Sequence, residues 1–359
     1  MKILTILGTR PEIIRLSRLI PLLDKLANHK LVFTGQNFEK NLSDIFFEEL
    51  KLRKPDFILD SRSPTPMSQI AKILAGVEKI INQVKPERLL VLGDTNSALS
   101  VIAAKRQGVK VFHMEAGNRC FDDRVPEEVN RRIIDHSSDI LMPYTERSRS
   151  NLLREGFASE RIFVTGNPIW EVLSYFQPQI EQSPILKKLK LEPKKYFLLT
   201  LHRAENVDLE ERLTNFLKSF ELLIKNYQLP IVYSLHPRTR FQLKKQHQKL
   251  PERIIALKPL GLFDFVHLEK NAFCVLSDSG TVQEECAIFK VPNVTLRDTT
   301  ERPETIEAGS NFLAGCQPED ILIGVKLATD SQPKWPPPAG YLAENVSLTA
   351  AKIILSHHQ

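Results

Sequence analysis

Short apolar runs alternate with longer amphipathic stretches along the first half of the chain. An apolar run bounded by turn residues predicts a buried strand, and an amphipathic stretch predicts a helix. The expected strands are residues 3–7, 31–34, 89–92 and 111–114. The expected helices are residues 12–28, where Pro21 could introduce a kink, and residues 98–107. This alternation predicts a parallel sheet with helices on both faces.

The same alternation begins again near residue 196. Strands are expected at residues 197–200, 231–234, 273–276 and 294–296, and helices at residues 209–226 and 281–289. The polar, proline-containing stretch 177–195 is typical of a linker between domains. After the proline-rich segment 333–338, a last helix at residues 343–355 is expected to return to the first domain.

The pattern therefore predicts an α/β protein with two doubly wound, Rossmann-like domains. The first is expected to span residues 1–176 together with 340–359, and the second residues 190–339.

Composition narrows the function classes only slightly. The formal charge of +6, from 49 basic and 43 acidic residues, fits an anionic small substrate such as a nucleotide, and equally a protein with no charged ligand. No basic run suggests nucleic acid, and no apolar run approaches the length of a membrane span. The start of the chain does not resemble a signal peptide, and the four cysteines form no CxxC pair. We therefore expect a cytoplasmic protein that binds neither nucleic acid nor membrane.

Polar residues follow several of the expected strands in the first half. Ligands of open α/β sheets bind outside the carboxyl ends of the strands. Arg10, in the turn after the first strand, could face an anion or belong to an ordinary strand–helix turn. Asp94 could be a functional carboxylate or a helix cap. Glu115 directly follows an apolar strand and precedes Ala-Gly, which packing explains poorly, so it is the strongest candidate from spacing alone.

A dense run of opposite charges occupies residues 122–132. Such runs are usually solvated surface. This one lies between two expected strands on the side that faces the crevice, which favours a functional role for Glu127 and Arg131.

The second half offers groups suited to a nucleotide. His202 and His236 each end an expected strand and have an arginine nearby. The small residues of 277–281 precede a helix, where backbone N–H groups could cradle a phosphate or simply cap the helix. Glu285, about one turn into that helix, could accept the two hydroxyls of a ribose. The two halves together predict a nucleotide held by the second domain, its attached group presented to carboxylates of the first, in a site between the domains.

Eight motifs occur in order from residue 1 to about residue 310. They read GTRPE, GDTNS, MEAGNR, RVPEEVNRR, LHRAEN, SLHPRT, SDSGTVQEE and RDTTERPE. As a set they resemble the non-hydrolysing UDP-N-acetylglucosamine 2-epimerases. The resemblance implies the two-Rossmann-domain architecture known as GT-B, with the active site in the interdomain cleft, and a homodimer as the assembly.

The resemblance also assigns roles to residues at matching positions. The expected catalytic residues are Asp94, Glu115, Glu127 and His202. The expected substrate-binding residues are Arg10, Arg15, Arg131, His236, Phe265, Ser279, Gly280, Glu285 and Arg302. Phe265 would pack near the uracil, and the other residues of the second half would bind UDP or stabilise its departure.

The chemistry implied by the family is elimination followed by re-addition. The hydrogen on carbon 2 is not acidic, because no carbonyl lies next to it. UDP therefore leaves carbon 1 while a base removes that hydrogen, and a glycal forms. Protonation on the opposite face and return of UDP complete the inversion, which requires two acid/base groups on opposite faces. No metal ion, NAD or other cofactor is expected.

Several positions depart from the family pattern. Arg15 stands where a lysine is usual, Asn118 and Cys120 alter the EAGLRT motif, and Ala204 alters HRRE. Gln36-Asn37 replaces a Gln-His pair tied to activation by a second substrate molecule. With these changes the chain resembles the branch that makes UDP-N-acetyl-L-fucosamine for capsule and O-antigen polysaccharides. This reaction and the interconversion of UDP-N-acetylglucosamine and UDP-N-acetylmannosamine both remain candidates. A glycosyltransferase, a hydrolysing epimerase and a non-catalytic UDP-sugar sensor are the rival functions.

Overall fold

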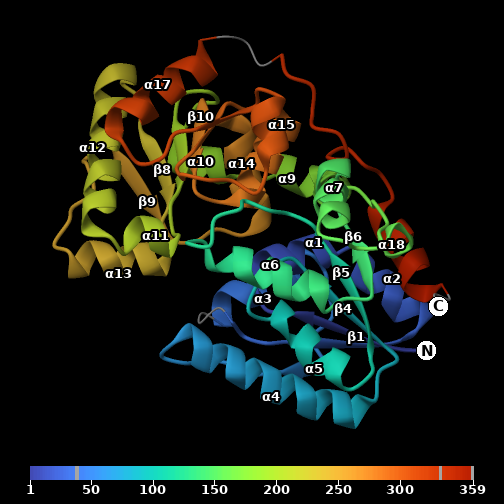
Figure 1. Ribbon diagram of the computed structural model, residues 1–359. Coiled ribbons are helices and arrows are strands. Elements are labelled where there is room, and N and C mark those ends of the chain that lie inside the picture. Colours follow the sequence, from blue (N-terminus) through green and yellow to red (C-terminus); the bar gives the residue numbers. More distant parts are fainter. Residues whose placement is uncertain (37–39, 331–333, 357–359) are drawn as a thin grey trace. The chain divides into compact units, whose positions relative to one another are not determined.

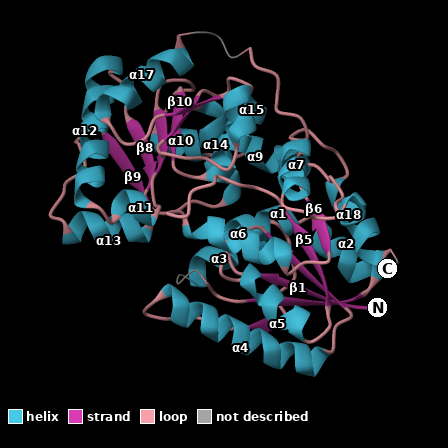
Figure 2. Ribbon diagram, viewed as in Figure 1, coloured by secondary structure: helices cyan, strands magenta, loops and turns pink. Residues whose placement is uncertain are grey.

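A computed structural model describes residues 1–36, 40–330 and 334–356 (Figures 1 and 2). The chain forms two compact units. Unit 1 comprises Met1–Tyr175 and Ala339–Gln359, and unit 2 comprises Phe176–Pro338. The expected domain boundaries thus lie within one residue of these bounds, except that unit 2 starts at residue 176 and not at 190.

The sheet of unit 1 has six parallel strands in the order β3-β2-β1-β4-β5-β6. The strands are β1 Lys2–Leu7, β2 Asn28–Phe33, β3 Phe57–Ile58, β4 Arg88–Leu92, β5 Lys110–Met114 and β6 Ile140–Met142. The strand order reverses between β1 and β4. The loops that follow these two strands therefore flank the position where doubly wound sheets bind ligands.

Helices cover both faces of this sheet (Figure 2). They are α1 Arg10–Leu16, α2 Leu19–Leu26, α3 Lys40–Glu49, α4 Pro66–Val84, α5 Val101–Arg106, α6 Pro126–His136, α7 Glu146–Arg154, α8 Ile169–Tyr175 and α18 Val346–Leu355, with short 3₁₀ turns η1 Ala98–Ser100 and η2 Ser159–Arg161.

The single helix expected over residues 12–28 is wrong. The chain leaves the helix at Ser17, and α2 begins at Leu19, two residues before Pro21. A proline lacks an N–H and its ring clashes with the carbonyl four residues earlier, which here belongs to Ser17. The proline therefore separates two helices and does not kink one.

The terminal helix α18 belongs to unit 1, as expected. It packs against α2, the Arg88 guanidinium donates to the carbonyl of Ile354, and the Ser347 N–H donates to Glu171 Oε2 at 2.9 Å. It begins at Val346, three residues later than expected.

Unit 2 repeats the architecture with six parallel strands in the order β12-β11-β10-β7-β8-β9. The strands are β7 Phe197–Thr200, β8 Ile231–Ser234, β9 Ile254–Leu257, β10 Cys274–Ser277, β11 Asn293–Thr295 and β12 Asn311–Leu313. The helices are α9 Gln177–Glu181, α10 Ile185–Leu189, α11 Ala204–Val207, α12 Glu210–Tyr227, α13 Pro237–Lys245, α14 Leu262–Asn271, α15 Gly280–Phe289, α16 Pro303–Glu307 and α17 Pro318–Thr329. Here the order reverses between β10 and β7.

The linker expected at residues 177–195 is also wrong. The stretch contains α9 and α10, and both pack against α14 of unit 2. Ile180 and Ile185 are buried by this packing. Leu186 and Leu189 of α10 also pack against the core of unit 2, so apolar side chains anchor this stretch.

Both sheets have apolar residues on their two faces, because helices cover both. Leu90 and Val91 in unit 1, and Leu198 and Leu276 in unit 2, have no exposed surface and point to opposite faces of their sheets. The predicted fold class, two doubly wound α/β units, is confirmed. Within the part of the chain that the structure describes, no helix is long and apolar enough to cross a bilayer.

Candidate active site

The turn after β1 is built on a glycine that no other residue could replace without a clash. A Cβ on Gly8 would lie 2.0 Å from Ser97 Oγ and 2.2 Å from Thr34 Oγ1, both of which are buried. These two hydroxyls hydrogen-bond each other at 2.6 Å. The loops after β1, β2 and β4 therefore meet closely at the carboxyl edge of the sheet.

Glu12 ties the first of these loops to the third. Its Oε2 accepts hydrogen bonds from the N–H groups of Gly8 at 2.8 Å and Thr9 at 2.6 Å, and its Oε1 accepts from Thr95 Oγ1 at 2.8 Å. Burial raises the pKa of Glu12 to about 7, although these hydrogen bonds lower it. Arg10, exposed at the start of α1, places its guanidinium 5.8 Å from the centre of the Phe46 ring.

Glu115 is a buried carboxylate held by a cation and two neutral donors. The Arg15 guanidinium forms an ion pair with its Oε2, Tyr144 Oη donates to the same oxygen at 3.3 Å, and Asn118 Nδ2 donates to Oε1 at 3.3 Å. Glu115 has a φ of +70°, a conformation that favours glycine. This unusual backbone conformation makes Glu115 a candidate for a functional role.

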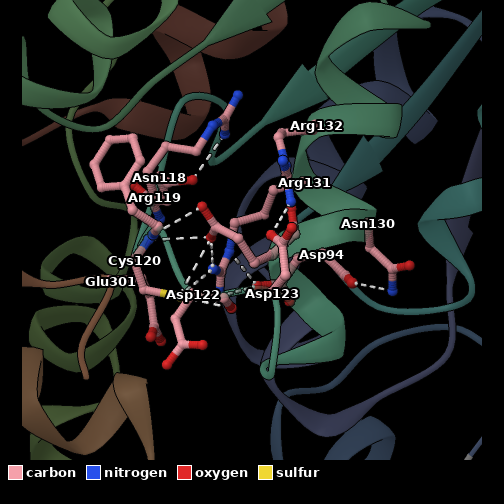
Figure 3. Close-up of polar contacts among 12 residues, drawn as sticks. Asp94, Asn118, Arg119, Cys120, Asp122, Asp123, Asn130, Arg131, Arg132 and Glu301 are labelled. Carbon is pink, nitrogen blue, oxygen red and sulfur yellow. Dashed lines mark hydrogen bonds and ion pairs between the residues drawn. The ribbon is translucent and has the colours of Figure 1, made fainter. Parts of the chain in front are cut away.

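A second set of charges joins β4 to α6 (Figure 3). Arg131 Nε donates to Asp94 Oδ2 at 2.9 Å, and its Nη1 pairs with Glu128. Glu128 in turn accepts from the N–H groups of Cys120 and Phe121, each at 3.0 Å. Asp94 and Arg131 were both expected in the site, and the structure brings them into contact.

Sequence reasoning missed Glu128 and selected its neighbour Glu127. Glu127 is half-buried, whereas Glu128 is 1% exposed. Burial alone would raise the pKa of Glu128, but the Cys120 N–H and the Arg131 guanidinium together lower it. Because α6 begins at Pro126, Glu128 is its third residue, the position from which a glutamate reaches back to preceding N–H groups. The third position of the helix is therefore the feature of the sequence that could have identified Glu128.

A buried histidine, His113, supports the loops after β4 and β5. His113 Nε2 lies 2.9 Å from the carbonyl oxygen of Gly93, and its Nδ1 lies 2.8 Å from Asp135 Oδ1. Arg119 pairs with the other oxygen of Asp135 at 2.7 Å. The Gly93 carbonyl, next to Asp94, is thereby fixed in position.

Gln36 also supports the loop after β4, since its Oε1 accepts a hydrogen bond from Ser97 Oγ at 2.9 Å. Its neighbour Asn37 lies outside the described residues.

In unit 2, two histidines lie together after β7 and β8. The ring centres of His202 and His236 are 5.3 Å apart. Asp278, which follows β10, lies 3.1 Å from His202 Nδ1 and accepts from the backbone N–H groups of His202 and Arg203 at 2.8 and 2.7 Å. The pKa of Asp278 is lowered despite its complete burial, chiefly by the charge and hydrogen bond of His202. Asp278, which sequence reasoning left without a role, thus orients the His202 imidazole.

The start of α15 is where the sequence predicts a phosphate cradle. A Cβ on Gly280 would lie 2.3 Å from Glu301 Oε1, so a larger residue there would have to displace that carboxylate. The N–H groups and the dipole at this helix start favour an anion. Ser279 Oγ lies 3.1 Å from Thr281 Oγ1 at the same turn.

The remaining candidates of unit 2 are buried or half-buried. Arg302 is 3% exposed and forms an ion pair with Glu284 of α15, so it braces the cradle from behind. Glu285 is 5% exposed on the same helix. Phe265, on α14, is half-buried against an apolar cluster that includes Leu268. Among the described residues, no group of three or more His, Cys, Asp or Glu could hold a metal ion.

The family model described as UDP-N-acetylglucosamine 2-epimerase matches residues 23–355. The chain belongs to this family. It is 42% identical over 350 residues to the UDP-N-acetylglucosamine 2-epimerase of Methanocaldococcus jannaschii, covering 95% of each chain. It is 38% identical over 333 residues to the UDP-2,3-diacetamido-2,3-dideoxy-D-glucuronate 2-epimerase of Pseudomonas aeruginosa, covering 91% of this chain and 92% of that one.

A crystal structure of the Methanocaldococcus jannaschii UDP-GlcNAc 2-epimerase in complex with UDP-GlcNAc and UDP has the same fold, with a TM-score of 0.94. It is 40% identical in sequence, and the match covers 98% of this chain and 99% of that one. The resemblance inferred from the motifs is confirmed, and as a member of this epimerase family the protein is an isomerase.

The buried Glu12 predicts a specific dependence of stability on pH. Its folded-state pKa, about 7, lies above the ordinary value of 4.5. The favourable contribution of Glu12 to the free energy of unfolding is therefore complete below about pH 4.5 and is lost as the pH rises through 7. The total loss is about 3 kcal/mol. The Glu12→Gln variant lacks this titration, so the stability of the wild type relative to the variant should fall between pH 4.5 and 8.

Urea denaturation over this pH range measures the effect, with the exposed Glu146→Gln variant as the control that should follow the wild type. A constant difference in stability between the wild type and Glu12→Gln would contradict the assignment.

Proposed function

We propose that the protein interconverts UDP-N-acetylglucosamine and UDP-N-acetylmannosamine by eliminating and re-adding UDP, without releasing free sugar. The main support is the pair of carboxylates at neighbouring strand ends, Glu115 after β5 and Asp94 after β4. Inversion requires one group to take a proton from carbon 2 and another to return one to the opposite face. Two carboxylates carried by different loops meet that need.

Unit 1 would act on the sugar. The C2–H and C1–O bonds break, a C1=C2 double bond forms, and the leaving UDP takes the electron pair of the C1–O bond. Arg15 keeps a positive charge beside Glu115, and Arg131 does so beside Asp94, which favours the ionised carboxylates that can accept a proton. Glu127 is the third candidate for an acid/base role.

Unit 2 would hold UDP and stabilise its departure. The start of α15 at Ser279 and Gly280 would bind the diphosphate, and Glu285 would accept the ribose hydroxyls. His202, oriented by Asp278, would donate to the departing oxygen. Preorganised donors of this kind stabilise charge that develops in a transition state.

A second candidate substrate, UDP-N-acetyl-L-fucosamine, is supported by one structural observation. Arg15 and Asn118, two of the positions that depart from the family pattern, both contact the Glu115 carboxylate. The departures thus alter the surroundings of the proposed acid/base group. The Pseudomonas aeruginosa relative, named for a third UDP-sugar, shows that the family includes 2-epimerases of different sugars.

The decisive experiment is incubation of the protein in D₂O with each UDP-sugar, followed by NMR at carbon 2. Deuterium at carbon 2 of intact UDP-N-acetylglucosamine and its C2 epimer is the expected result. Free N-acetylmannosamine would indicate a hydrolysing epimerase. Exchange only with UDP-N-acetyl-L-fucosamine would select the second substrate, and no exchange with either would favour a transferase or a sensor.

The Glu115→Gln variant separates chemistry from binding. The amide keeps the size of the side chain but cannot accept the proton, so kcat should fall by ~10²–10⁴-fold while the Kd for UDP changes little. Steady-state kinetics and calorimetric titration with UDP provide the two numbers. The control is Glu146→Gln on the surface of unit 1, and comparable losses of turnover and UDP affinity in Glu115→Gln would contradict the role.

We further propose that the protein works as a homodimer in the cytoplasm and supplies a sugar nucleotide for polysaccharide synthesis. The family resemblance supports the homodimer and the role in polysaccharide synthesis, and the absence of paired cysteine motifs supports the cytoplasm. Light scattering of the purified chain should give twice the monomer mass of 41.0 kDa, and a monomer would contradict the assembly.

A further inference from the structure

The loop after β4 lies close to both carboxylates proposed for acid/base work. Gly93 directly precedes Asp94, and a Cβ placed on Gly93 would lie 3.7 Å from Glu115 Oε2. The Gly93 N–H donates to the carbonyl of Met114 at 3.0 Å, which ties this loop to the end of β5. Because the loop begins where β4 ends at Leu92, such contacts decide where Asp94 lies relative to Glu115.

Helix α6 holds this loop from two residues that lie one helical turn apart. Arg131 acts on the side chain, since its Nε donates to Asp94 Oδ2 at 2.9 Å (Figure 3). Asp135 acts on the backbone through His113, whose Nδ1 lies 2.8 Å from Asp135 Oδ1 and whose Nε2 lies 2.9 Å from the carbonyl oxygen of Gly93. His113 is 1% exposed and Asp135 has no exposed surface, so water does not compete for these contacts.

Both ring nitrogens of His113 face groups that can only accept a hydrogen bond. The carbonyl of Gly93 is one of them. The other is the carboxylate of Asp135, whose Oδ2 pairs with Arg119 at 2.7 Å. Burial alone would raise the pKa of Asp135, but His113 and Arg119 together lower it. His113 therefore donates from both nitrogens. Its positive charge is balanced, because Arg119 is shared between Asp135 and Glu155.

We propose that His113 is a positioning residue that sets the separation of the two acid/base carboxylates. Its backbone belongs to β5, two residues before Glu115, and its ring reaches the carbonyl directly before Asp94. One side chain thus joins the strand that leads to one carboxylate to the loop that carries the other. This inference rests on the proposed roles of Asp94 and Glu115. A reacting group misplaced by about 1 Å costs ~10²-fold in rate, so the separation matters.

Two amide variants of His113 separate its two hydrogen bonds. His113→Gln places an N–H donor where Nε2 lies and can still reach the carbonyl of Gly93. His113→Asn places its donor where Nδ1 lies and can still reach Asp135, but it is too short for Gly93. Both variants remove the imidazole and its charge equally. A difference between them therefore reports on the contact with Gly93.

Steady-state kinetics of the two variants give the first test. His113→Asn should lower kcat by ~10²-fold and leave KM nearly unchanged, because the carboxylate is displaced while the groups that bind the nucleotide are intact. His113→Gln should recover most of that loss. His136→Asn, an exposed position on α6, is the matched control and should follow the wild type. Assays run well below the thermal unfolding midpoint of every variant, so loss of folded protein does not contribute.

A double-mutant cycle shows whether His113 acts through Asp94. In an Asp94→Asn background, His113→Asn should cause no further fall in the rate of deuterium entry at carbon 2, since the group that it positions is already gone. A merely structural role would lower the rate in both backgrounds by the same factor. That result, equal kcat in His113→Gln and His113→Asn, or a rise of KM in place of the fall of kcat would overturn the inference.

Crystal structures of the two variants give a readout that needs no turnover. In His113→Asn the Gly93 carbonyl and Asp94 should move relative to Glu115, and in His113→Gln they should stay in place. If the wild type introduces deuterium into no UDP-sugar, the proposed reaction fails and these structures decide the inference alone. An unmoved Asp94 in His113→Asn would then overturn it.

Discussion

A parallel sheet brings the carboxyl ends of its strands to one edge, and in unit 1 the side chains gathered at that edge are charged and largely buried. Each carboxylate there needs a cation or several N–H donors beside it, because removing the partner of a buried charge costs ~3–5 kcal/mol. Glu115 has the Arg15 guanidinium, while Asp94 and Glu128 share that of Arg131. The segments after β4 and β5 are irregular, and these ion pairs hold them in place. The requirement to pair buried charge thus determines the shape of the proposed catalytic half.

Two of the departures from the family pattern, Arg15 and Asn118, lie within this group of paired charges. Arg15 offers several donors in one plane where a lysine would offer a point charge, and its guanidinium lies 5.6 Å from the centre of the Tyr144 ring. The Tyr144 hydroxyl contacts the same carboxylate as Arg15 and Asn118 do. In unit 2, by contrast, the motif SDSGTVQEE at the start of α15 is one of those that resemble the family. The choice among UDP-sugars is therefore best sought around Glu115, on the side of the molecule assigned to the sugar.

The sequence predicted the central strands and the loops after them, because long apolar runs and the geometry of parallel sheets leave little freedom. Strands of two or three residues, such as β3 and β12, give no such run. The partners of the site residues were also beyond reach. Which of two adjacent glutamates turns inward depends on the phase of α6. The role of Asp278 depends on its contact with His202, which lies 76 residues earlier in the chain and is brought close by the pairing of β7 with β10.

Burial by itself does not decide the charge of a carboxyl group in this protein, since its neighbours can reverse the effect. Glu12, with only N–H and hydroxyl donors, has a pKa raised to about 7. Glu128 adds a guanidinium to its N–H donors, and its pKa is lowered. Glu269 faces another carboxylate, and its pKa is raised well above the ordinary range. The protonation of these three buried glutamates is thus set by the groups that lie next to each, because their depth of burial is similar.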